Sequence, residues 1–192
     1  MPRRALIAPT DRILKKWDEV NRERKVLGIG SIDVHAYPYR MGPIRVTIFP
    51  YKVQLKAIRT HVLVPEPVPD DFGQLKRAIY QALRDCRVFI SNYRWGDARD
   101  FRIHCENNNG VAIIGDELEF CEYSIIKIRV PQTSVLRLIY NGEPVFEGIG
   151  YEFDYKAKQA GLYRAEIYVN GKGWIFSNHI RLNKKEGETK LR

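Results

Sequence analysis

The sequence of 192 residues lacks several features that mark whole classes of protein. No run approaches the roughly 18 consecutive apolar residues of a membrane span, and residues 1–12 contain no long apolar core of a signal peptide. We therefore expect a cytoplasmic protein without membrane association. The chain is also too short for a complete eight-stranded α/β barrel, which needs about 250 residues.

Cysteine is scarce, with three residues in the whole chain. An odd number without Cys-x-x-Cys spacing indicates neither a disulfide framework nor a structural zinc knuckle. We expect Cys86, Cys105 and Cys121 to be free thiols, mostly buried. Histidine is scarce as well, with four residues, which limits the metal sites that the chain can build.

Acidic residues are few in the first third of the chain. Residues 1–60 contain 13 lysine and arginine residues against five acids, a net charge of +8 out of +9 for the whole chain. This asymmetry favours an anionic partner, which could be a phosphorylated small molecule, nucleic acid or an acidic protein face. A solvated basic surface accounts for the same composition, so charge alone does not choose between these.

The second half of the chain has the pattern of antiparallel β structure. Short apolar runs recur at intervals of about ten residues, and Asn-Gly pairs at 109/110, 141/142 and 170/171 predict tight hairpin turns. We expect a β-sandwich of immunoglobulin-like type over residues 91–184, with Trp174 in its core and a flexible tail at residues 185–192. Asn178, His179 and Arg181 are expected at a solvated edge.

The first half mixes helix and strand signals. Apolar residues at helical spacing predict one helix after Thr10 and another after Asp70 or Asp71. Residues 25–32 form a short, almost wholly apolar run, as expected for a strand buried on both faces of a parallel sheet. Alternation over residues 44–64 predicts two further strands.

Asp33 and His35 follow that apolar run. In a parallel α/β sheet ligands gather at the carboxyl ends of the strands, and the Asp-x-His spacing places both side chains on one side of an extended chain. A carboxylate and an imidazole are suitable ligands for zinc, manganese or iron. Taken alone the motif is common by chance, and a hydrogen-bonded pair is the simpler interpretation.

The sequence Gly-Ser-x-Asp-x-His-Ala over residues 30–36, preceded by a Trp-Asp helix, resembles the last metal-binding motif of the polymerase and histidinol phosphatase (PHP) superfamily of metal-dependent phosphoesterases. The resemblance extends over about residues 8–183. Further segments similar to proteins of this group are 49–51, 59–63, 89–92, 96–99, 161–166 and 174–178.

The resemblance implies a fold and a set of site residues. The family fold is a distorted (β/α)7 barrel that holds two or three metal ions, so residues 1–90 would be a terminal helix-strand part of such a barrel, within an α+β chain. Asp33 and His35 would be metal ligands. Residues expected in a second shell or at a phosphate are His61, Arg59, Arg40 and Tyr37.

The family's opening His-x-His motif and its intermediate ligands have no counterpart here, because the remaining histidines, His61, His104 and His179, fall elsewhere. A catalytic zinc site takes three or more protein ligands, so the resemblance implies a chain that is inactive until a separately encoded barrel portion completes it and a divalent metal binds.

Two alternatives remain open at the level of sequence. The chain could be a non-catalytic interaction or structural module with a vestigial motif, which self-associates or binds another protein. Interleaved tyrosine and basic residues at Tyr37, Tyr39 and Arg40 also allow a polyanion-binding protein, although the same residues could line a phosphate pocket, and nucleic-acid binding is the least favoured of the three.

Overall fold

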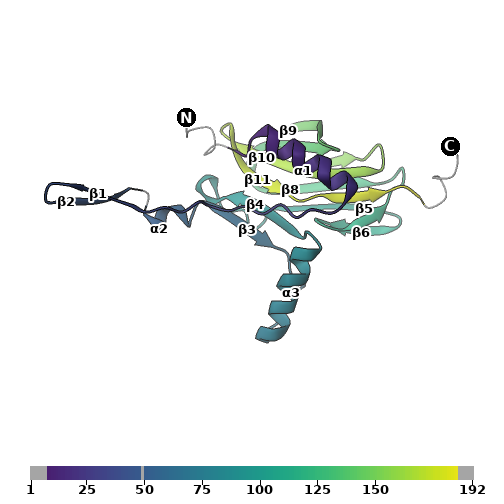
Figure 1. The fold of residues 1–192 in the computed structure, drawn as a ribbon. Helices are drawn as coiled ribbons and strands as arrows, with labels where there is room; N and C mark the ends of the chain where they lie inside the picture. The colour runs from purple at the N-terminus through teal and green to yellow at the C-terminus, as the bar shows by residue number, and fades with distance from the viewer. Residues whose placement is uncertain (1–7, 49, 186–192) are drawn as a thin grey trace.

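The computed structural model describes residues 8–48 and 50–185. Most of the chain forms one curled, half-barrel β-sheet with few helices, so the expected α+β, antiparallel, strand-rich fold is confirmed at that level (Figure 1). The elements are α1 (Asp11–Glu23), β1 (Tyr37–Met41), β2 (Ile44–Ile48), α2 (Tyr51–Gln54), β3 (Ile58–Val62), α3 (Phe72–Arg84), β4 (Val88–Asn92), η1 (Tyr93–Trp95), β5 (Arg102–Asn107), β6 (Gly110–Ile113), β7 (Glu117–Glu119), β8 (Ile125–Tyr140), β9 (Glu143–Lys156), β10 (Gly161–Val169), β11 (Lys172–Ser177) and β12 (Ile180–Asn183).

Ten strands belong to the main sheet. Its path is β3-β4-β11-β10-β8-β5-β6, with β9 paired to β8 and β12 paired to β10 and β7. Among the described strands only β12 and β7 run parallel. The expected domain boundary at residue 90 falls inside β4, which joins β3 to β11, so the sheet continues across it.

The sheet curls around one apolar core. Alternation of side chains along the strands brings Trp174, Tyr163 and Ile167 to its interior, each at most 1% exposed. The expected core position of Trp174 is confirmed. Cys86 and Cys105 are buried free thiols and Cys121 is half-buried, close to expectation. Burial raises the pKa of the Cys105 thiol to about 12, which leaves it an unreactive apolar side chain.

Two of the three Asn-Gly pairs close hairpins as predicted, whereas Gly110 of the third pair is already the first residue of β6. Asn141 and Gly142 connect β8 to β9, and Asn170 and Gly171 connect β10 to β11; all four residues have positive φ angles. This conformation is a type I′ turn, whose twist matches that of the flanking strands. Some of the short apolar runs of the second half join into the two long strands β8 and β9, whose pairing is irregular between Arg129 and Ser134.

Helix α1 lies across the sheet and is fixed there by a buried ion pair (Figure 1). Both carboxylate oxygens of Asp18 accept hydrogen bonds from Arg164 on β10, at 2.6 and 2.7 Å, and Oδ1 also lies 2.7 Å from His179 Nε2. Arg164 donates a third bond to Glu166 at 2.6 Å. All four side chains are at most 7% exposed. The expectation of a solvated edge for His179 is therefore wrong, because α1 covers this end of the sheet.

The stability of this cluster depends on pH through the protonation of Asp18 and His179. Burial raises the pKa of Asp18, but hydrogen bonds from Arg164 and His179 outweigh it, and the pKa lies below its ordinary value. Burial lowers the pKa of His179 despite its bond to Asp18. Each group binds a proton more readily in the unfolded chain, so the stability they contribute is present above the unfolded histidine pKa of about 6.5 and is lost as the pH falls.

Helix α3 projects from the body beyond β3 (Figure 1). Its start is the predicted one, since Asp71 Oδ1 accepts a hydrogen bond of 2.8 Å from the Gln74 N–H. Only Ala82 in this helix is buried. The α3 face that the sequence predicts to be apolar is thus only partly covered.

Replacement of Asp18 by asparagine should lower the free energy of unfolding at neutral pH by about 3 kcal/mol, because the Arg164 charge then stays buried without its main counter-ion. Urea denaturation followed by tryptophan fluorescence measures this. The variant should still lose stability on acidification, because burial keeps the pKa of His179 low without Asp18. An Asp18→Asn chain as stable as the native one contradicts the assigned role of the pair.

Candidate functional site

Residues 24–36 connect α1 to the ribbon formed by β1 and β2, and they are extended without belonging to any strand ladder. Three side chains each bind the N–H and C=O of one residue in this segment. The Asn21 amide binds Val26 at 3.1 and 3.1 Å, the Asn178 amide binds Gly28 at 2.8 and 2.9 Å, and the Thr60 hydroxyl binds Gly30 at 3.0 and 2.9 Å. The predicted strand at 25–32 is therefore wrong as a ladder strand, because side chains replace a neighbouring strand along one edge.

Two glycines let this segment approach the body closely. A Cβ atom at Gly28 would lie 2.5 Å from the Trp17 ring, and one at Gly30 would lie 2.5 Å from Ile90 and 2.6 Å from Ile58. Carbon atoms cannot come so near without displacing their neighbours. The Gly28-x-Gly30 pair thus serves packing on α1 and on strands β3 and β4.

The opposite edge of the segment is open. The alternate residues Leu27 and Ile29 have no backbone hydrogen bond to any described residue. Ile29 is 62% exposed. Alternation along an extended chain sends their N–H and C=O groups away from Asn21, Asn178 and Thr60. This part of the chain has the shape of a strand with one edge paired and the other free.

Asp33 and His35 follow the carboxyl end of this extended segment. Asp33 Oδ1 is 2.8 Å from His35 Nε2, and their side chains are 92% and 56% exposed. The His35 ring stacks on Tyr37 at the start of β1, with ring centroids 5.6 Å apart. The Asp-x-His spacing thus brings the two side chains together on one side of the chain, as the sequence predicts, and the pair faces solvent.

The remaining predicted site residues lie elsewhere. His61 stacks on Phe89 at 4.2 Å and its Nε2 is 2.8 Å from Ser91 Oγ, while the Arg59 guanidinium lies 3.5 Å from the centre of the Tyr93 ring. Burial, and then the charge of Arg59, lower the pKa of His61. By strand alternation both side chains point to the face of β3 opposite Thr60, which binds Gly30. Arg40 lies in the ribbon and donates to Gly42 O at 3.2 Å.

The donors in the described part of the chain do not make a complete metal site. Among residues 8–48 and 50–185, no group of three His, Cys, Asp or Glu side chains could hold a metal ion. Asp33 and His35 are two suitable ligands, whereas zinc sites in proteins use three or four. A metal held by this pair alone would be weakly bound.

One hollow of about 460 Å³ lies between β5, the irregular part of β8 and β9. Arg102 and Arg129, which face each other across the two strands, line it together with Tyr151. None of the predicted site residues lines this hollow. It is therefore a feature separate from the Asp33–His35 pair.

Three residues that no sequence motif indicates hold the segment before the Asp33–His35 pair in place. Asn21, Thr60 and Asn178 are polar residues, for which a solvated position is the default expectation. Asn178 is instead 1% exposed and also donates to the Val88 carbonyl at 2.9 Å. The position of Asn178 directly after the buried strand β11 is the one sequence feature that could have indicated its role.

Substitution of Asp33 by asparagine or His35 by glutamine should change the free energy of unfolding by less than about 0.5 kcal/mol, because exposed ion pairs contribute little. Gly30→Ala should instead cost about 1–3 kcal/mol through its contact with Ile58 and Ile90. Thermal unfolding of the three variants measures both effects. A large loss from the exposed pair would contradict its placement in solvent.

Comparison of the chain with protein-family models, with curated proteins and with solved structures gives no match. In the described part of the chain, no helix is long and apolar enough to cross a membrane.

Proposed function

We propose that this chain is the terminal part of a metal-dependent phosphoesterase of the PHP class, and that it supplies Asp33 and His35 to a metal site whose other ligands lie outside these 192 residues. The open backbone edge at residues 25–32 is the observation that carries the proposal. An apolar extended segment with one free edge calls for a strand beside it, and natural proteins do not leave such edges uncovered.

The position of the acid–imidazole pair fits this assignment. The segment from Lys25 to Ile32 would be a strand of a parallel sheet, and Asp33 and His35 would lie at its carboxyl end, where ligand sites of such sheets occur. The Asp33 carboxylate and the His35 imidazole would each offer one donor atom. The metal itself would supply the activation of water for attack on a phosphate ester.

The chain is not an enzyme by itself under this proposal. Two exposed donors hold a metal too weakly, and no third donor is near them in the part of the chain described. Residues 25–35 would extend the sheet of the barrel, position two metal ligands and join the β-rich body to the barrel. A divalent metal, zinc, manganese or iron, would bind only in the completed site.

A non-catalytic interaction module is the second candidate. It is favoured by the direct contact of Asp33 with His35 at 2.8 Å, because each side chain already has a partner without a metal. Under this alternative the open edge at residues 25–32 still receives a strand, but no phosphatase activity follows.

Hydrogen exchange of the isolated chain tests the open edge. The amides of Val26, Gly28 and Gly30 should exchange slowly, because side chains accept their hydrogen bonds, whereas those of Leu27 and Ile29 should exchange at rates near those of an unfolded chain. Equal protection of all five amides would show that the edge is already covered and would remove the proposal.

Zinc titration by calorimetry tests the metal site. The isolated chain should show no saturable binding at micromolar zinc, and Asp33→Asn should leave that result unchanged. Mixing with a polypeptide that carries the family's His-x-His motif from the same source should create tight binding and phosphatase activity. Both gains should be lost with Asp33→Asn or His35→Gln but kept with Glu122→Gln, an exposed control. Activity that survives both site variants would exclude the assigned ligands.

A further inference from the structure

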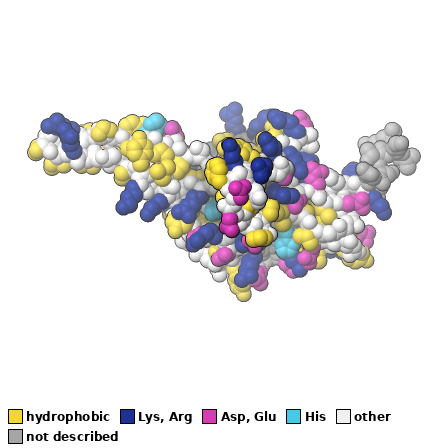
Figure 2. All heavy atoms as spheres, turned by 90° about the horizontal axis from the view of Figure 1, so that it is seen from below, with side chains coloured by type: hydrophobic (Ala, Val, Ile, Leu, Met, Phe, Trp, Pro, Cys, Tyr) yellow, Lys and Arg dark blue, Asp and Glu magenta, His cyan; other side chains and the backbone are white. Residues whose placement is uncertain are grey.

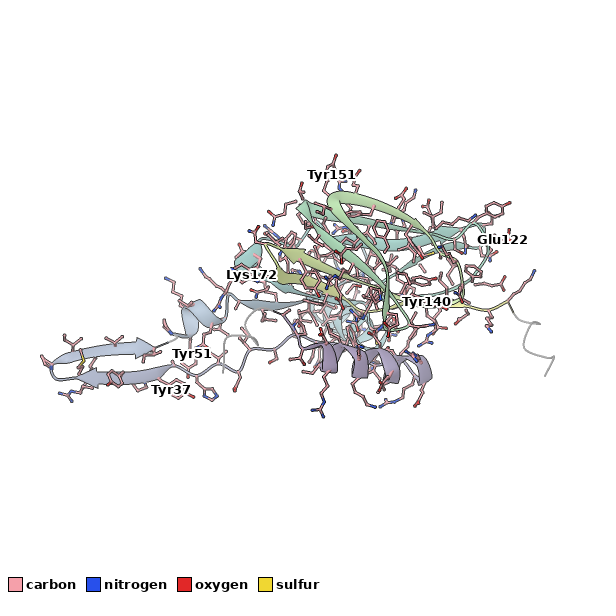
Figure 3. The ribbon with its side chains drawn as sticks, turned by 90° about the horizontal axis from the view of Figure 1, so that it is seen from above. Tyr37, Tyr51, Glu122, Tyr140, Tyr151 and Lys172 are labelled. Atoms are coloured by element: carbon pink, nitrogen blue, oxygen red, sulfur yellow. The ribbon has the colours of Figure 1, made fainter. Side chains whose placement is uncertain are left out.

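Helix α1 is attached to the sheet mainly by polar groups. Three of its residues are buried, and two of the three are polar: Leu14, Asp18 and Asn21. Trp17 and Val20 are half-buried, and Ile13 is 62% exposed. Figure 3 shows α1 along one side of the body, on the side of Tyr140 at the end of β8. Few apolar side chains of the helix are buried, so its docking depends on charges and hydrogen bonds.

The apolar core of the sheet does not include α1. Side chains alternate along β10, so Tyr163, Ala165 and Ile167 belong to the core, whereas Arg164 contacts Asp18 on the opposite face. No residue of α1 belongs to the cluster of buried apolar side chains in the described part of the chain. Release of the helix would therefore bring the ion pair of Arg164 into water and leave the core covered by its own strands.

His179 is the group in this contact whose charge changes near neutral pH. An ionised carboxylate only accepts hydrogen bonds, so the bond of 2.7 Å to Asp18 is donated by His179 Nε2. The other ring nitrogen, Nδ1, is buried and has no hydrogen-bond partner among the described residues. In the neutral ring this atom is an unpaired acceptor. Protonation would turn it into a buried N–H donor of a charged ring without an acceptor, which costs more.

Titratable and charged groups surround the His179 ring on several elements. They are Asp18 on α1, Arg164 and Glu166 on β10, Arg181 on β12, and Lys25, Cys86, Asp116 and Glu117 near a cavity of about 10 Å³. Asp116 already accepts hydrogen bonds from Arg87 and the Ile113 N–H, and Glu117 binds Lys25 at 3.0 Å. These two acids are therefore engaged with other partners, and the cavity is too small for more than one water molecule.

The pKa values in this cluster favour a neutral ring. Burial lowers the pKa of His179, and the charges of Arg164 and Arg181 lower it further, against the bond to Asp18. Burial raises the pKa of the Cys86 thiol, so this neighbour stays neutral. The docked His179 thus resists a proton that a histidine in water accepts at an ordinary pKa of about 6.5. Each unit of pH below that value favours release of the helix by up to about tenfold.

The other histidines lie away from this contact. His35 and His104 have side chains that are 56% and 34% exposed, and histidine side chains are visible at the surface in Figure 2. Water can reach these rings and solvate a charge there. His61 contacts Phe89 and Ser91 in the β3–β4 part of the sheet. Protonation of His179, in contrast, acts on α1 directly, through the carboxylate that it binds.

We propose that α1 is a pH-sensitive latch, docked on β10 at neutral pH and increasingly released below about pH 6.5 while the β-sheet stays folded. The His179 ring can hold a charge in water only when the helix leaves, so a proton and the helix compete for it. The chain after the latch stays in place, because Asn178 and Thr60 bind residues 28 and 30 without help from α1. The latch does not depend on the proposed metal site.

Hydrogen exchange of the full chain at about pH 7.5 and about pH 5.5 tests the latch, with rates corrected for the intrinsic effect of pH on amide exchange. A helix of 13 residues is marginally stable alone in water. The amides of residues 14–23 should therefore lose protection by up to about tenfold at the lower pH. The amides of residues 163–168 in β10, and those of Gly28 and Gly30, should keep their protection.

Two variants test the groups that hold the latch. His179→Gln keeps an N–H donor for Asp18 but cannot be protonated, so the protection of α1 should lose its dependence on pH. The matched control His104→Gln removes an exposed histidine and should keep the native dependence. Asp18→Asn should lower the protection of α1 at least about tenfold already at about pH 7.5, and the amides of β10 should stay protected.

Three results overturn this inference. The first is a native chain whose α1 amides are equally protected at both pH values. The second is a loss of protection that α1 and β10 share, because the whole sheet then unfolds with the helix. The third is a His179→Gln chain that keeps the native dependence on pH. None of these results bears on zinc binding, so the metal proposal is judged separately.

Discussion

The buried pair between Asp18 and Arg164 is the contact on which the geometry of the first third depends. It fixes α1 on β10, and α1 in turn places Trp17 and Asn21, whose side chains bind the carbonyl of Val26 at 2.9 and 3.1 Å. From there Asn178 and Thr60 guide the chain across the sheet to Asp33. The β-rich body therefore sets the direction in which the Asp33–His35 pair faces. It does so through the buried ion pair between Arg164 and Asp18.

Side-chain hydrogen bonds along residues 26–30 replace the backbone hydrogen bonds that a neighbouring strand would make with one edge of this segment. A buried peptide group must find a partner, and here two amides and a hydroxyl provide it without closing the other edge. Polar side chains at Asn21, Thr60 and Asn178 thus keep the segment extended, attached and still open.

The sequence predicted the second half well, because each feature there is local. Asn-Gly turns, alternating strands and the cap at Asp71 depend on residues a few positions apart. It failed for residues 25–32, where a strand and an extended segment held by side chains share one apolar pattern. It also failed for His179, whose burial depends on α1, more than 150 positions earlier in the chain. Only the three-dimensional contact between Asp18 and Arg164 shows that α1 covers this residue.

The free edge and the uncovered ribbon are different kinds of incompleteness. The outer edge at residues 25–32 lacks hydrogen-bond partners, and a strand lying about 4.8 Å away would supply N–H and C=O groups along its whole length. The apolar face of the ribbon, which carries Tyr37, Tyr39, Met41 and their partners on β2, lacks contacts that exclude water, and any complementary apolar surface can supply these. Because strand pairing and face packing use different groups of this chain, one molecule can satisfy both needs at the same time without competition between the two partners.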